Sequence, residues 1–198
     1  MENNTAPVGC VIMASGLASR FGSNKLLALW QGRPLLAAVL DTVGQVFPLR
    51  VVVTRSPDVA RLCGQLSVPC LLHSLPLRSD TVRLGLEALL ARCPAMAGCL
   101  FCAGDQPLLT PQSLRAMAQA FAKDPAAVCR LSWQGQGGNP VLFPARLFPA
   151  LRALPPGKGG GVLLQTEKER VLLVPALSEH ELFDVDRPED LARLTRLG

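Results

Sequence analysis

The stretch that decides the fold covers residues 8–25, which read Val-Gly-Cys-Val-Ile-Met-Ala-Ser-Gly-Leu-Ala-Ser-Arg-Phe-Gly-Ser-Asn-Lys. Its first part, Val8 to Ala14, is a short apolar run that stops at Gly16, which is typical of a buried strand. The second part is rich in small residues and carries the cations Arg20 and Lys25. Small residues let backbone N–H groups approach a phosphate closely, and the cations favour the same anion. The stretch therefore predicts a strand followed by a phosphate-binding loop.

The spacing within this loop excludes two common nucleotide motifs. The sequence has neither the G-x-x-x-x-G-K-[ST] spacing of a Walker A loop nor the G-x-G-x-x-G spacing of a dinucleotide site. An ordinary surface loop is the simpler alternative. The two cations directly after the first strand argue against it, because they favour a bound anion.

The amino-acid composition limits the classes of protein to which the chain can belong. The chain has 198 residues, of which 49% are apolar and 18% are charged, and this balance excludes disorder. A formal net charge of +5 without a block of like charges favours a small phosphate-bearing partner over nucleic acid. The chain lacks Tyr and has few other aromatic residues, so we do not expect a stacking surface for nucleic acid.

Localisation and thiol chemistry follow from further features of the sequence. No apolar run reaches about 18 residues, and the start of the chain lacks the positive charge of a signal peptide. We therefore expect a cytoplasmic protein without a membrane partner, in which the cysteines are reduced thiols. Cys99 and Cys102 have CxxC spacing but lie in an apolar run, so we expect core residues rather than a metal or redox site.

Beyond the first stretch, strand-like apolar runs alternate with segments of helical periodicity. This alternation indicates a mostly parallel sheet covered by helices on both faces, in one Rossmann-like α/β domain over residues 1–198. The Gly- and Pro-rich region 134–161 is expected to be irregular and to form one wall of a cleft. We expect strands at 8–14, 50–54, 69–73, 99–103, 127–133, 141–143, 171–175 and 182–185, and helices at 34–43, 57–66, 80–92, 111–121, 144–154, 159–165 and 188–197.

Two acidic segments follow later strands. Asp105 comes directly after the run at 99–103, and a carboxylate there can bind a Mg²⁺ ion that bridges triphosphate oxygens. Asp184 and Asp186 are two residues apart, so they share one face of an extended segment and repel each other unless a cation lies near. The alternative is that Asp186 only caps the helix opening at Pro188. Because ligands of open parallel sheets bind beyond the carboxyl ends of the strands, we expect these carboxylates to converge on the phosphate loop.

Taken together, the motifs resemble those of the nucleotidyltransferase family that matures the molybdenum cofactor. The opening loop is similar to that family's L-A-A/G-G-x-S-x-R-[MF]-G-x-x-K signature, and the match runs in order over nearly the whole chain. The other matching segments are Ser79-Asp80-Thr81-Val82-Arg83-Leu84-Gly85-Leu86, Gly104-Asp105-Gln106-Pro107-Leu108-Leu109-Thr110-Pro111, Gly138-Asn139-Pro140-Val141 and Asp184-Val185-Asp186-Arg187-Pro188-Glu189-Asp190-Leu191. The segment 157–161 departs from the family, since it lacks the Asp and Arg often found there.

The resemblance implies that the terminal phosphate of an acceptor attacks the α-phosphorus of a nucleoside triphosphate, with Mg²⁺ bound and pyrophosphate released. Asp105 would be the main metal ligand, completed by Asp184 or Asp186. Arg20 and Lys25 would hold the β- and γ-phosphates and form the catalytic set with Asp105. The implied nucleotide-binding residues are Ala14, Ser15, Gly16, Ser19, Arg20, Gly22, Lys25, Ser79, Thr81 and Arg83, and the implied acceptor wall is Gly138 and Asn139.

The partners that the resemblance implies are a nucleoside triphosphate, the molybdenum cofactor, and the molybdoenzyme or its chaperone. The guanylyl-transferring branch of the family usually has two glycines where this chain has Ser15-Gly16. A side chain there would narrow the base pocket, so we favour CTP over GTP and the cytidylyl-transferring branch.

Three alternatives compete with this interpretation. A transferase with the same loop could act on a sugar phosphate or another small phosphorylated acceptor, or transfer a guanylyl group. A nucleotide-sensing or chaperone-like binding protein could keep the loop but would not need the acidic residues at positions 105, 184 and 186. A purely structural domain does not explain three strand-end motifs in order.

Overall fold

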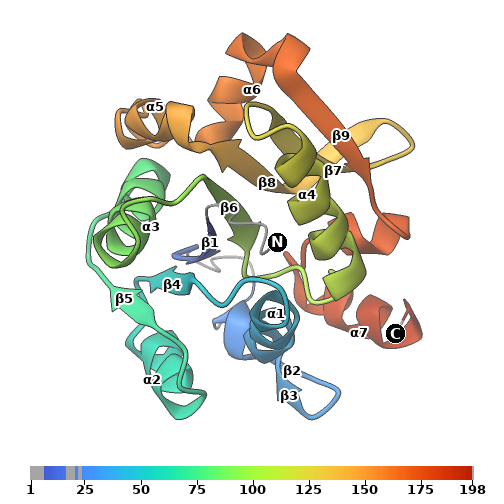
Figure 1. Ribbon diagram of the computed structural model, residues 1–198. Helices are drawn as coiled ribbons and strands as arrows, with labels where there is room; N and C mark the ends of the chain where they lie inside the picture. Colours follow the sequence, from blue (N-terminus) through green and yellow to red (C-terminus); the bar gives the residue numbers. More distant parts are fainter. Residues whose placement is uncertain (1–6, 17–20, 22–23, 198) are drawn as a thin grey trace.

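A seven-stranded sheet forms the centre of the molecule, in the order β5-β4-β1-β6-β8-β7-β9 (Figure 1). The computed structural model describes residues 7–16, 21 and 24–197. Strand β8 runs antiparallel to its neighbours β6 and β7, while the other strands of the sheet all run in one direction. The strands are β1 (Val8–Ala14), β4 (Arg50–Thr54), β5 (Cys70–Leu72), β6 (Gly98–Ala103), β7 (Val128–Trp133), β8 (Gln136–Pro144) and β9 (Val171–Pro175).

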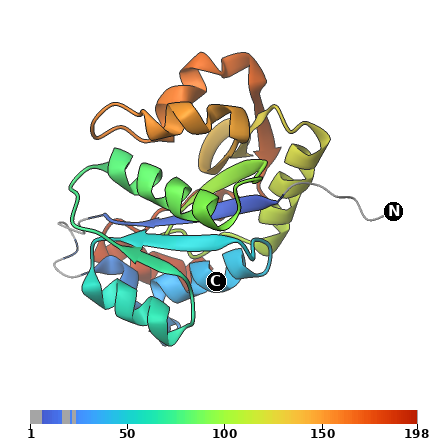
Figure 2. The same cartoon turned by 60° about the vertical axis from the view of Figure 1, so that its left-hand side comes forward.

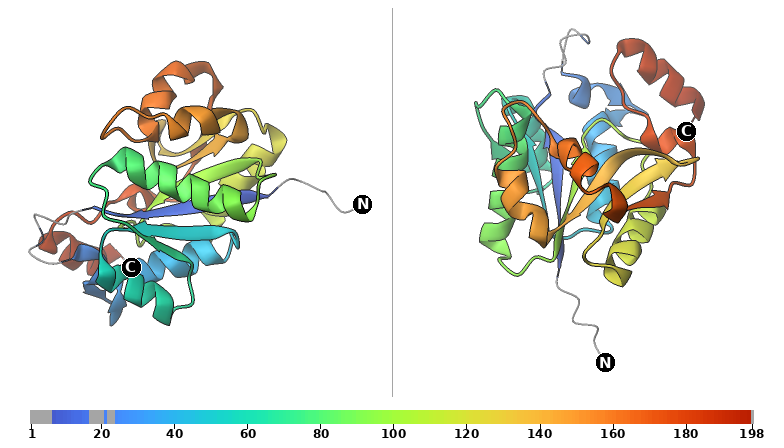
Figure 3. Two further views of the ribbon diagram at one scale, coloured as in Figure 1. Left: turned by 90° about the vertical axis from the view of Figure 1, so that its left-hand side faces the viewer. Right: turned by 90° about the horizontal axis from the view of Figure 1, so that it is seen from above.

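Helices cover both faces of this sheet, as Figures 2 and 3 show. Helices α1, α2, α4 and α7 pack on one face and α3, α5 and α6 on the other, each group contributing apolar side chains to the core on its side. The predicted mostly parallel α/β fold is therefore confirmed. The helices are α1 (Leu35–Gly44), α2 (Pro57–Gln65), α3 (Arg78–Arg92), α4 (Pro111–Lys123), α5 (Phe148–Arg152), α6 (Leu163–Thr166) and α7 (Pro188–Leu197), and a hairpin of β2 (Leu29–Trp30) and β3 (Arg33–Pro34) precedes α1.

The apolar strands are buried because successive side chains enter the two cores in turn. In β1, Cys10 and Ile12 belong to the core under α1, whereas Val11 belongs to the core under α3. The same alternation separates Cys99 from Cys102 in β6, since residues three apart face opposite sides of a strand. Both thiols are fully buried in different cores, which confirms their expected structural role.

Two expectations about the second half of the chain are wrong. Residues 182–185 do not form a strand, because the backbone N–H of Val185 donates to the carbonyl of Asp105 (3.0 Å) and binds this segment to a loop. Region 134–161 is also more regular than expected, since β7 and β8 form a long hairpin. Its two-residue turn has positive φ at Gln134 (47°) and Gly135 (80°), which suits the twist of a hairpin.

None of the helices in the described part of the chain has both the length and the apolarity needed to cross a lipid bilayer.

Candidate active site

A cavity of about 590 Å³ opens where the carboxyl ends of β1, β4 and β6 meet. Its lining includes Ser15 and Gly16 after β1, Arg55 after β4, and Asp105 after β6. It extends over the α3 side of the sheet, where Phe101 and Phe143 form its apolar floor. The volume lies in the range of small-molecule and cofactor sites, which is roughly 300–1,000 Å³.

Three of the predicted residues meet at one edge of this cavity. The Lys25 ammonium lies 2.6 Å from a carboxylate oxygen of Asp105 and donates to Oδ1 of Asp186 at 2.9 Å. Lys25 opens a short 3-10 helix, Lys25–Leu27, whose first turn is capped by the side chain of Asn24 accepting from Leu26 N. The cap fixes the direction in which Lys25 leaves the loop. Asp105 and Asp186, which are far apart in sequence, thus share one cation.

Asp184 completes the acidic cluster. Burial, followed by repulsion from Asp105 and Asp186, raises the pKa of the Asp184 carboxyl to about 6, although Lys25 and Arg78 oppose the shift. The residue is nevertheless exposed at the surface of the cavity, and solvent there screens part of this repulsion. Burial lowers the pKa of Lys25, but its hydrogen bonds to Asp105 and Asp186 outweigh this and leave it raised. The site therefore carries more negative charge than Lys25 alone neutralises.

A buried carboxylate holds the segment that carries Asp184 and Asp186. Glu181 is 1% exposed and accepts hydrogen bonds from Thr110 N and Oγ1, Ser113 Oγ and Leu177 N, at 2.7–2.9 Å. Thr110 is the N-cap of α4, so Glu181 joins the late segment to the start of that helix. Sequence reasoning missed this residue because one Glu in a polar stretch gives no signal of burial.

The opposite edge of the cavity is built around Ser15. Its hydroxyl donates to the carbonyl of Val53 (3.1 Å) and lies 3.0 Å from Nε2 of His73, while its own carbonyl accepts from Arg55 Nε (3.0 Å). Burial, with the charge of Arg55 next, lowers the pKa of His73 against the opposing effect of Asp80, so the imidazole is neutral at pH 7. Sequence reasoning missed His73 as a residue of this edge. Its position one residue after β5, at a parallel strand's carboxyl end, is the signal that could have identified it.

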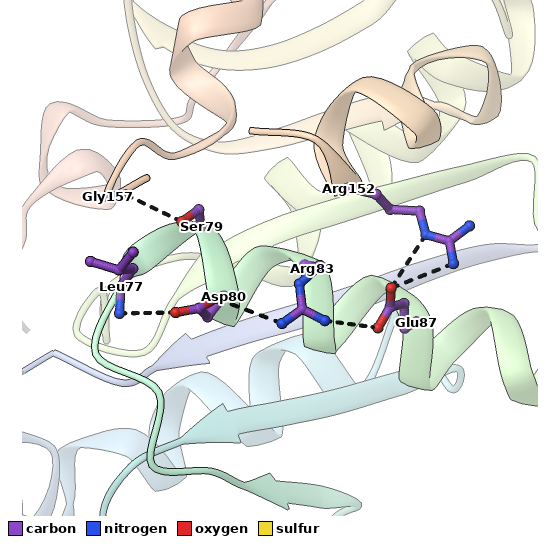
Figure 4. Close-up of polar contacts among 7 residues, drawn as sticks. All are labelled: Leu77, Ser79, Asp80, Arg83, Glu87, Arg152 and Gly157. Atoms are coloured by element: carbon purple, nitrogen blue, oxygen red, sulfur yellow. Dashed lines mark hydrogen bonds and ion pairs between the residues drawn. The ribbon is translucent and has the colours of Figure 1, made fainter. Parts of the chain in front are cut away.

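The predicted residues of α3 do not all face the cavity, because they lie on different sides of the helix. Thr81 is 2% exposed and lines the cavity, and so does Arg78. Ser79 and Arg83 do not line it, because neighbouring positions of a helix point about 100° apart. Figure 4 shows Ser79 Oγ accepting from Gly157 N (3.2 Å) and Arg83 paired with Asp80 and Glu87. The helix begins at Arg78, two residues before its predicted start, and this residue was missed.

The far wall of the cavity differs in detail from the expectation. Asn139 lines it, but Gly138 does not, and a Cβ on Gly138 would meet Leu182 Cδ2 at 2.8 Å. The carbonyl of Gly138 instead accepts from Nε of Arg130 (3.0 Å), a lining residue that the sequence reasoning missed. Ala14 also lines the cavity. The predicted residues Ser19, Arg20 and Gly22 lie outside the described residues.

Within the described ranges, no three His, Cys, Asp or Glu side chains are arranged as a ready-made metal cage. A Mg²⁺ ion does not require one, because it usually binds one or two carboxylates and completes its shell with water and phosphate oxygens. The cation of Lys25 already sits between Asp105 and Asp186, so the donors suit a positive charge.

Comparison with known proteins defines the class first. A solved nucleotidyl transferase from Methanothermobacter thermautotroptrophicus (Mth528) superposes with a TM-score of 0.80, covering 98% of both chains at 23% identity. The structure of Rv0371c from Mycobacterium tuberculosis gives a TM-score of 0.76 at 27% identity, covering 97% of this chain and 99% of that one. The fold is thus that of a nucleotidyltransferase.

The sequence defines the family more narrowly. Residues 10–171 match the family described as the MobA-like NTP transferase domain, and the chain belongs to this family of nucleotidyltransferases. A probable molybdenum cofactor guanylyltransferase from Deinococcus radiodurans is 31% identical over 194 residues, which are 97% of this chain and 96% of the relative.

Proposed function

We propose that the protein transfers a nucleoside monophosphate from a nucleoside triphosphate to the terminal phosphate of the molybdenum cofactor. The observation that carries the proposal is the convergence of Lys25, Asp105 and Asp186 at one edge of a cavity formed by strand ends. The acceptor is favoured by the name of the relative from Deinococcus radiodurans, which aligns with this chain from end to end.

In this reaction an oxygen of the acceptor phosphate forms a bond to the α-phosphorus, and the bond from that phosphorus to the bridging oxygen of pyrophosphate breaks. Such a transfer needs alignment and neutralised charge more than covalent help from the protein. We assign Lys25 to the triphosphate and its departing pyrophosphate. Ala14, Ser15 and Gly16 would contact the base and ribose, with Thr81 beside them at the cavity wall.

Mg²⁺ is the metal that the donor set favours. Asp105 and one of Asp184 and Asp186 would hold it, because all three carboxylates crowd one edge, where burial and then repulsion from the other two raise the pKa of Asp184. When bound, the ion would neutralise charge on the triphosphate oxygens. The family's phosphate chemistry suits an ion with oxygen ligands, and the fully buried Cys99 and Cys102 are not available as soft ligands.

We propose GTP as the donor, because the relative that spans the whole chain is named a guanylyltransferase. CTP, which the sequence favours, is the second candidate. It is supported by the side chain of Ser15, which fills space at the cavity edge that glycine would leave open.

The test is to incubate the purified protein with Mg²⁺, molybdenum cofactor and either GTP or CTP, and to identify the product by mass. We expect a guanylylated cofactor and stoichiometric pyrophosphate. A cytidylylated cofactor alone would support the second candidate and overturn the first. No product with either nucleotide, while a sugar phosphate does accept a nucleotide, would overturn the proposed acceptor. The Asp105→Ala variant is the control for contaminating transferases.

A further inference from the structure

The cavity contains arginine side chains that are not in ion-pair contact with a carboxylate of the described residues. In the described part of the chain, neither Arg78 nor Arg130 forms an ion pair, although both line the cavity. By contrast, Arg61, Arg83, Arg146 and Arg152 all pair with acidic residues elsewhere. Arginine binds phosphate through a rigid fork of donors, so unmatched arginines in a cavity point to a phosphate-bearing ligand.

Arg130 is an unusual residue for its place in the sheet. It pairs with Val141 of β8, which in turn pairs with Phe101 of β6, so the three side chains form a row on one face. Val141 and Phe101 are buried apolar residues of the core under α3, whereas Arg130 is only half-buried and faces the cavity beside them. A guanidinium that ends an apolar row costs desolvation unless it meets an anion.

The side chain of Arg130 is held in place by the backbone of the same hairpin. Its Nε donates to the carbonyl of Gly138 (3.0 Å), and a Cβ on Gly137 would come within 2.6 Å of that nitrogen. The guanidinium therefore lies flat over Gly137. With Nε occupied, the terminal nitrogens are the donors that remain for a ligand.

Arg78 approaches the cavity from the other side, at the first position of α3, which packs over β4 and β1. Its side chain rests on Gly159, where a Cβ would lie 3.1 Å from Arg78 Cδ. The glycine segment at 159–161 lines the cavity as well and is joined to α3 through the bond from Gly157 N to Ser79 Oγ (Figure 4). Arg78 and Arg130 thus both line the cavity, Arg78 from α3, where its charge also acts on Asp184, and Arg130 from the hairpin.

We propose that Arg130, assisted by Arg78, forms an anion subsite that binds the phosphate monoester of the acceptor and so selects for phosphorylated acceptors. The inference rests on the proposed function for the direction of transfer. Lys25 is engaged by Asp105 and Asp186 at the metal edge, and Arg55 donates to the carbonyls of Ser15 and Pro76. Among the described lining residues, Arg78 and Arg130 are therefore the cations best placed for a second, separate phosphate. The reacting phosphates would then be neutralised by different groups.

The kinetic test compares Arg130→Gln and Arg130→Lys with Arg61→Gln. Arg61 carries the same charge but lies on the surface, where it pairs with Asp58. We expect Arg130→Gln to raise the KM for the acceptor by about 10- to 100-fold, the usual effect of a lost charge-assisted hydrogen bond. The KM for the nucleoside triphosphate should change less than about twofold, and Arg130→Lys should lie between Gln and wild type. An unchanged acceptor KM, or equal increases in both KM values, would overturn the proposal.

A second measurement does not depend on turnover, so it separates this inference from the proposed function. In ¹⁵N-labelled wild-type protein with Mg²⁺ and a non-hydrolysable nucleoside triphosphate, inorganic phosphate is titrated while the arginine Nε–H signals are followed. We expect a saturable shift of the Arg130 and Arg78 signals and none of the Arg61 signal. A lack of any shift at Arg130 would overturn the subsite even if transfer occurs, whereas a shift without transfer would overturn only the reaction.

Discussion

The two edges of the cavity are built in different ways. At the edge formed by β1, β4 and α3, the lining residues Ser15, Arg55 and Thr81 follow a strand directly or lie on one helical face. At the edge formed by the hairpin and the late segment, Asp186 is positioned by an ion pair with the distant Lys25, and Arg130 by a hydrogen bond within its hairpin. The first edge depends on regular backbone, whereas the second depends on a few hydrogen bonds and ion pairs. Mutations at the two edges should therefore have different effects.

The largest effect is expected at the residue that joins the edges. Asp105→Ala removes the expected metal ligand and should lower the rate of pyrophosphate release by about 10²–10³-fold or more. The fold should persist, since Asp105 lies in a loop and Lys25 keeps Asp186 as its partner. Asp58→Ala is the matched control, because Asp58 pairs only with Arg61 on the surface. Full activity in Asp105→Ala would refute the metal assignment.

The hydrogen bonds that Glu181 accepts at the second edge are tested by Glu181→Ala. The change leaves donors of Thr110, Ser113 and Leu177 without their acceptor, and a donor that stays buried and unpaired, as that of Ser113 would, costs about 1–3 kcal/mol. We expect a loss of roughly 3 kcal/mol in the free energy of urea unfolding and a higher Mg²⁺ requirement for activity. Glu179→Ala, at an exposed neighbour, should change stability by less than about 0.5 kcal/mol. Equal effects of the two variants on stability would show that the hydrogen bonds of Glu181 do not stabilise the protein.

The regular edge is tested at the contact of α3 with the sheet. A Cβ at Gly85 would come within 2.5 Å of Val11 Cγ1, so Gly85→Ala should cost about 1–3 kcal/mol and displace the helix. Gly64 in α2 has no heavy atom within 4 Å of an added Cβ, so Gly64→Ala should stabilise by about 0.5–1 kcal/mol. Thermal unfolding of both variants measures the difference. If Gly85→Ala did not change the stability, the packing of α3 against the sheet would not require a glycine at this position.

The smallest effect concerns the charge of Asp184. Its pKa is raised from 3.8 in the unfolded chain to about 6, so the protonated form stabilises the fold at low pH and this contribution is lost as the pH rises through about 6. In metal-free buffer, Asp184→Asn should therefore gain stability relative to wild type as the pH rises from 4 to 7. The gain should stay below about 1 kcal/mol, because water screens the exposed carboxylate. Saturating Mg²⁺ should remove this gain in stability. A gain that does not depend on pH would contradict the repulsion between Asp184 and the other two carboxylates.

Sequence patterns predicted the first edge better than the second for a physical reason. Apolar runs and strand-end polar residues repeat at short range, so they located β1, β4 and β6 and the loops that bear Ser15 and Asp105. Burial of Glu181 and the contact of His73 with Ser15 involve residues far apart in sequence, and Arg130 is placed by a hairpin that was expected to be irregular; periodicity records neither. The strand expected at 182–185 failed because a backbone hydrogen bond joins Val185 to Asp105, a residue far away in the sequence.

The most direct measurement of the central claim is a crystal structure with Mn²⁺, as an anomalous substitute for Mg²⁺, and a non-hydrolysable nucleoside triphosphate. We expect an anomalous peak about 2.1 Å from a carboxylate oxygen of Asp105. We also expect the triphosphate beside Lys25 and the base next to Ser15. A metal bound away from Asp105, or a triphosphate outside this cavity, would refute the proposed site.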